Sequence, residues 1–167
     1  ANDLLAVYAA GASGHITGLG NEAVTINEAG AGGDAKVSVA DANLIDSYTS
    51  GAITGTILET DSTTLATLNS DADNTNSYTI TVTGNADAGD LVTLETKTAL
   101  EVTMTGLNTV SGTLAEVEAL FTLHDDDKVN LGASPSIAIT LSDTNVAVAQ
   151  ANTISSQLLH QAIISKN

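Results

Sequence analysis

One pattern occurs three times along the chain: a short helical segment rich in Leu and Ala, a polar loop, a strand, a second helical segment and a second strand. Corresponding positions recur at offsets of about 47 to 62 residues, and the scatter lies in loops. Repetition of helix and strand predicts stacked units that contact only their neighbours. We therefore expect one domain, 1–167, built from approximate copies 1–58, 59–112 and 113–167.

The copies align element by element. The first helical segments are 3–9, 62–68 and 114–121, and the first strands are 23–26, 77–83 and 136–142. The second helical segments are 41–46, 88–93 and 150–155, and strands follow them from about Ala52, Ala99 and Ala162. The last strand, 161–165, would leave an open edge, so we expect the chain to continue into a further unit.

The strand segments alternate apolar residues with threonine. Tyr78, Ile80 and Val82 alternate with threonines at 79, 81 and 83, and similar alternation occurs at 53–57, 100–105 and 137–142. Such alternation predicts a sheet with one face on the core and one face in water. The expected fold is an α/β repeat solenoid with a mostly parallel sheet covered on one side by short helices. An all-β sandwich of adhesin type is the alternative, because Thr-rich alternating strands also suit it.

The short helices need capping residues at their first turns. The sequence places Ser62–Thr64, Thr113, Asp41 and Asp87 where a side-chain oxygen would accept from free N–H groups. Gly51 lies where the chain passes from one element to the next.

The chain is strongly acidic. Its 20 acidic residues face four lysines, which gives a net charge of −16. Such a surface repels nucleic acid and anionic lipid, so neither partner is expected, whereas cations are favoured. A hydrophobic content of 43% argues against disorder. No run of about 18 apolar residues predicts membrane insertion.

The sequence contains no pattern typical of an enzyme. Cysteine is absent, which excludes disulfides and thiolate chemistry. The three histidines lie in different copies without metalloprotease spacing, and no serine stands in a Gly-x-Ser-x-Gly turn. We therefore expect a protein without catalytic activity.

Two acidic loops are candidate calcium sites. Asp71, Asp73 and Thr75 place oxygen atoms at alternate positions, although the glycine and glutamate of an EF-hand loop are missing. Asp125, Asp126 and Asp127 follow His124 and supply further ligands for a divalent ion. The alternative in both places is a solvated loop. We expect no required cofactor and treat calcium as a candidate stabiliser.

Three segments resemble the tandem repeats of very large cell-surface and secreted proteins of marine cyanobacteria, and of structural fibre proteins of their phages. These segments are 16–26, 39–57 and 108–121. The resemblance rests on repeat pattern and implies a structural role at a cell surface, outside the cell or in a virion. We expect the module to assemble side to side or end to end, through its open strand edges, with copies of itself or with neighbouring repeats. The alternative is an adhesive module whose Thr rows or Asp loops bind a glycan, a host receptor or ice.

Overall fold

The computed structural model describes residues 2–27, 36–70, 75–132 and 137–164, without the side chains of residue 2 and 158–164. Its helices are α1 (Asn2–Ala12), α2 (Val39–Asp46), α3 (Ser62–Leu65), α4 (Ala88–Thr93), the 3₁₀ helix η1 (Leu94–Lys97), α5 (Leu114–Asp125) and α6 (Val148–Ile164). Its strands are β1 (Val24–Thr25), β2 (Lys36–Val37), β3 (Ile53–Ile57), β4 (Ser77–Thr79), β5 (Thr81–Asp87), β6 (Val102–Gly112), β7 (Val129–Asn130) and β8 (Ala138–Leu141).

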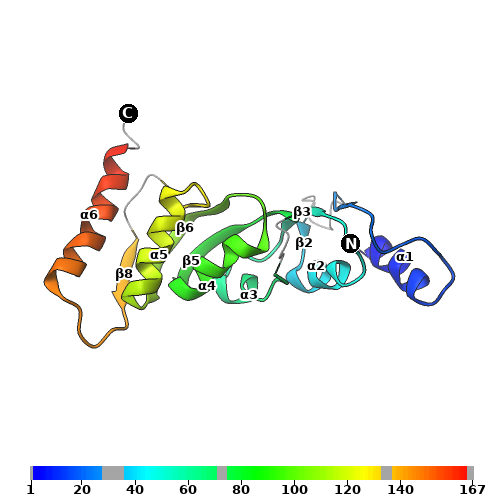
Figure 1. Ribbon diagram of the computed structural model, residues 1–167, viewed down its shortest axis with the longest axis horizontal. Helices are drawn as coiled ribbons and strands as arrows, with labels where there is room; N and C mark the ends of the chain where they lie inside the picture. The colour runs from blue at the N-terminus through cyan, green and yellow to red at the C-terminus, as the bar shows by residue number, and fades with distance from the viewer. Residues whose placement is uncertain (1, 28–35, 71–74, 133–136, 165–167) are drawn as a thin grey trace.

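Every described strand pairing is parallel. Strand β3 pairs with β1, β2 and β4, and strand β6 pairs with β5, β7 and β8. Only Ile80 separates β4 from β5, so the two four-stranded sheets share one stretch of chain. The molecule is elongated, with α1 at one end and α6 at the other (Figure 1). The mixed α/β class with mostly parallel sheets is therefore confirmed, and the all-β sandwich is wrong.

The core lies between the sheets and the helices. The alternation predicted at 78–83 is confirmed, since Tyr78, Ile80 and Val82 are buried while Thr79 and Thr83 are exposed. The helices contribute further aliphatic residues together with the only phenylalanine, Phe121. Because isolated helices this short are marginal in water, packing on the sheet stabilises them.

Two buried threonines, one before β3 and one before β6, make the same kind of hydrogen bonds to backbone. Thr49 Oγ1 donates to the carbonyl of Glu22 and accepts from the N–H of Gly51. Thr98 Oγ1 donates to the carbonyl of Tyr78 at 2.8 Å and accepts from the N–H of Leu100. Both threonines are buried, so each hydroxyl satisfies backbone groups that water cannot reach.

Acidic side chains bind the first turns of helices that precede them in the chain. Glu59 accepts from the N–H of Val39 in α2, and Asp143 accepts from the N–H of Leu114 in α5. Asp90 accepts from the hydroxyl of Thr63 in α3. Since helix N-termini favour negative charge, part of the acidity has a structural role.

Three expectations about local structure are wrong. The segment 161–164 is helical, as the end of α6, and residue 165 lies outside the description. The alternation at 100–105 predicts that Leu100 faces the core. In the structure Leu100 is 44% exposed, because β6 begins only at Val102. The caps of α2 and α3 are Ser38 and Asp61, rather than Asp41 and Ser62–Thr64. The caps at Asp87 and Thr113 are confirmed.

Candidate functional site

A face of threonine, serine and asparagine side chains lies on the side of the sheet away from the core. Paired positions across neighbouring strands include Thr54 with Ser77, Thr56 with Thr79, Thr81 with Thr103, and Thr103 with Asn130. Paired strands lie about 4.8 Å apart, so hydroxyl groups repeat at that spacing across the sheet. We call these six hydroxyl residues and Asn130 the threonine face. Its chemistry suits a flat, hydroxylated ligand, because each threonine offers a donor, an acceptor and a methyl group.

The pairing of β5 with β6 is irregular beyond the threonine face. Register shifts occur between Thr81 and Thr83 and between Gly84 and Asn85. Gly84 has a φ of 84°, a left-handed conformation that glycine adopts without strain. Such bulges bend a strand, so the regular part of the face ends at Thr81.

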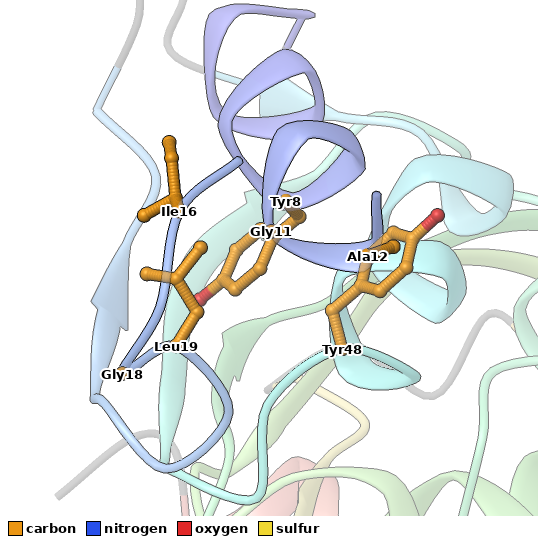
Figure 2. Close-up of a pocket in the computed structure, with 7 residues that line it drawn as sticks. All are labelled: Tyr8, Gly11, Ala12, Ile16, Gly18, Leu19 and Tyr48. Carbon is orange, nitrogen blue, oxygen red and sulfur yellow. The ribbon is translucent and has the colours of Figure 1, made fainter. Parts of the chain in front are cut away.

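A cavity of about 350 Å³ lies at the α1 end of the molecule. We call it the Tyr8–Tyr48 pocket, and Figure 2 shows its lining, which is Tyr8, Gly11, Ala12, Ile16, Gly18, Leu19 and Tyr48. The two tyrosine rings are stacked, with centroids 5.5 Å apart and planes 7° apart. Residues from α1, the following loop and the turn after α2 build the pocket, so sequence patterns within one element could not reveal it.

Glu22 fixes the chain close to this pocket. Its Oε2 accepts from the N–H groups of Gly20 and Asn21, while Oε1 is buried and meets no donor in good hydrogen-bond geometry. A hydrogen bond from the Tyr8 hydroxyl is the main influence that lowers the pKa of Glu22 to about 2. Burial, followed by the Glu22 carboxylate, raises the pKa of Tyr8 to about 12.

These two pKa values predict how stability changes with pH. Glu22 has a folded pKa below its ordinary 4.5, so its contribution is complete above about 4.5 and is lost as the pH falls toward 2. Tyr8 has a folded pKa above its ordinary 10.0, so its contribution is lost as the pH rises from 10 toward 12. We expect Glu22→Gln to reduce the fall in Tm between pH 5 and pH 2.5, measured by circular dichroism at several pH values.

The matched control removes an equivalent charge from α5. Glu118→Gln should leave the acid dependence of Tm as in the wild type, since Glu118 lies on α5 and does not line the Tyr8–Tyr48 pocket. Equal acid dependence in the wild type and Glu22→Gln would contradict the proposed role of Glu22.

The predicted calcium site at 71–75 lies mostly outside the described residues, whereas the residues of the site at 125–127 lie inside them. Asp71 and Asp73 lie outside the described residues, and only Thr75 of that loop lies inside them. His124 and Asp125 end α5, and Asp126 caps it. His124 Nδ1 lies 2.9 Å from the carbonyl of Val129, so this ring atom is engaged with backbone. Within the described ranges no group of three or more His, Asp or Glu side chains is placed to hold a metal ion.

A buried lysine was not expected at this position. Lys97 is buried in η1, and its Nζ donates to Ser70 Oγ at 3.1 Å. Burial lowers the pKa of Lys97. Ser70 immediately precedes Asp71, so the ammonium group brings positive charge to the start of a predicted calcium loop. A cation supplied by the chain itself reduces the attraction of that place for calcium.

The outer strands of the molecule are interrupted. Residues 26–35 separate β1 from β2 at one edge, and 131–137 separate β7 from β8 at the other. Among the described residues no strand pairs with the outer side of any of these four. Short, interrupted edges offer few backbone groups for pairing with another sheet.

The described helices include none that is both long and apolar enough to cross a membrane. Comparison of the chain with protein families, with curated proteins and with solved structures finds no match.

Proposed function

We propose that the chain is a non-catalytic structural module, an α/β solenoid whose copies join end to end in a filament, surface layer or virion fibre outside the cell. The observation that carries the proposal is the all-parallel pairing within two sheets that follow each other along the chain at β4 and β5, with short helices α2 to α5 between successive strands. Folds of this kind grow in one direction, and their usual work is to span distance and present surface.

The repeated hydrogen bonds support the solenoid. Thr49 precedes β3 in the first proposed copy and Thr98 precedes β6 in the second, and both bind backbone of the preceding strand line. Each proposed copy then contains two helix–strand units. In a stack of this kind every unit is stabilised mainly by its neighbours, so its end units have surfaces that another unit would cover.

The charge supports assembly that depends on ions. At −16, two copies repel one another at low ionic strength, and salt screens this repulsion over a Debye length of about 10 Å at 0.1 M. We expect chain growth to increase with sodium chloride. Calcium ions at equal ionic strength would increase it further only if the loops at 71–75 or 125–127 bind them.

The second candidate is an adhesive module, favoured by the threonine face. In that case a glycan or a receptor would lie across the paired hydroxyls of β3, β4, β5 and β6. The described strands carry few aromatic side chains for stacking on sugar rings, which makes this candidate the weaker one.

The test measures mass by light scattering over a range of concentrations, in EDTA, in sodium chloride and in millimolar calcium, with particles checked by electron microscopy. The structural proposal predicts ordered chains whose mass rises with concentration and salt. A monomer under every condition that is retained by a carbohydrate array would overturn it in favour of the adhesive module.

A further inference from the structure

The Tyr8–Tyr48 pocket has an apolar rim that the protein itself leaves uncovered. Ile16, which lines the pocket, is 39% exposed. The small residues Gly11, Ala12 and Gly18 form much of the remaining wall (Figure 2). Leu19 closes one side, since a Cβ on Gly11 would lie 2.7 Å from its Cδ1. The open side of the pocket faces solvent, so an apolar side chain that covers it would have to come from another molecule.

The opposite end of the molecule presents an apolar projection. Val148, the first residue of α6, is 77% exposed, more than any other large hydrophobic side chain in the described part of the chain. Ala147, Ala149 and Ala151 beside it are also exposed. We call these four residues the α6 plug. An exposed apolar turn at the end of an elongated protein is costly in water unless a partner covers it.

The helix ends at these two places have opposite partial charge. α6 has no acidic residue in its first turn, and α1 has no basic residue in its last turn. The last residues of α1, Gly11 and Ala12, line the pocket. Bringing the N-terminus of α6 toward the C-terminus of α1 would pair a positive with a negative helix end, which contributes about 0.3–1 kcal/mol.

We propose that the α6 plug of one copy docks in the Tyr8–Tyr48 pocket of the next, joining copies head to tail. The inference rests on the proposed function and names the contact that would carry it. α1 and α6 lie at opposite ends of the molecule (Figure 1), so plug and pocket of one chain cannot satisfy each other. A contact between two different surfaces that does not close on itself produces an open chain of copies. The occupant is a second copy because the chain supplies both the cavity and the complementary apolar turn.

The test uses two blocking variants of the full chain. Val148→Asp places a charge on the plug but leaves the pocket intact, and Ala12→Phe fills the pocket but leaves the plug intact. Each variant alone should remain monomeric by sedimentation velocity in 0.5 M sodium chloride, with association at least tenfold weaker than in the wild type. An equimolar mixture should form dimers and nothing longer, since one pocket and one plug remain functional.

The matched control places the same charge on a different exposed apolar residue. Leu58 is 54% exposed and follows β3 in the middle of the chain, so Leu58→Asp should assemble as the wild type does. Far-ultraviolet circular dichroism checks folding, and Ala151→Asp and Ile16→Asp replace any blocking variant that does not fold.

The outcomes separate this contact from the proposed function. Chains of normal length from folded Val148→Asp and Ala12→Phe would overturn the plug-and-pocket contact while leaving end-to-end assembly intact. A wild-type chain that remains monomeric at every concentration and salt would overturn the proposed function and this contact together. If dimers form in the equimolar mixture and in neither variant alone, the result would support the plug-and-pocket contact and the end-to-end assembly that depends on it.

Discussion

Gly51→Ala is expected to lower the free energy of unfolding by about 3 kcal/mol. The added methyl group would clash with backbone atoms, which cannot rotate away as the end of a flexible side chain can. A Cβ at Gly51 would lie 2.2 Å from the carbonyl oxygen of Glu22 and 2.7 Å from the backbone nitrogen of Ala23. The substitution therefore forces apart the segments that lead into β3 and β1. A loss of about 3 kcal/mol corresponds to a fall in Tm of roughly 10 °C for a chain of this size, measured by thermal circular dichroism.

Gly89→Ala is the control for this prediction. A Cβ at Gly89 in α4 would lie 3.0 Å from a carboxylate oxygen of Glu116 and 3.1 Å from Oδ1 of Asp87, so these two capping side chains would have to shift only slightly, without movement of backbone. Alanine also favours the helix by up to about 1 kcal/mol, so the Tm should change little. If Gly51→Ala had the wild-type Tm, the backbone of residue 51 would not lie as close to the carbonyl group of Glu22 as the structure places it.

The types and order of most elements could be predicted from periodicity. The helix predicted at 88–93 has these bounds in the structure, and the strand at 77–83 becomes β4 and β5. These segments succeed because the apolar residues follow one period over the full length of the element. Gly51 was predicted to lie at a junction, although the close backbone approach that requires glycine there depends on residue 22.

The C-terminal segment shows where periodicity is ambiguous. The residues at 162–164, Ala-Ile-Ile, form a short apolar run that suits a buried strand and a helix equally well. In the structure these residues continue the 17-residue helix α6, so the predicted strand edge at that end does not form. The length of the preceding helical segment, beginning at Val148, would have been the better guide.

The Tyr8–Tyr48 pocket and the placement of acids at helix ends depend on contacts between distant residues. Tyr8 meets Tyr48 across 40 positions of sequence, and Asp143 meets Leu114 across 29. The sequence showed that acids were abundant and that Thr113 would cap α5, but it could not show which carboxylate reaches a neighbouring helix. Such partners depend on how the helices pack in three dimensions, which patterns within one element do not contain.

Phe121→Ala is expected to lower the free energy of unfolding by about 3–5 kcal/mol, because it deletes a buried ring and leaves a cavity. Phe121 is 1% exposed and lies on α5, which packs against α4, β6, β7 and α6. The measurement is denaturant unfolding followed by circular dichroism. Phe121→Leu, which keeps most of the volume, should cost less than about 1.5 kcal/mol.

The same variant tests how cooperative the chain is. If each part of the chain is stabilised mainly by its neighbours, weakening α5 should let the segment from α5 to α6 unfold at lower denaturant than the segment from α2 to α4. This would appear as a second unfolding transition and as early hydrogen exchange in β8. A single transition at lower denaturant with an unchanged m value would instead mean that all units unfold together. Wild-type stability in Phe121→Ala would contradict the packing of the ring itself.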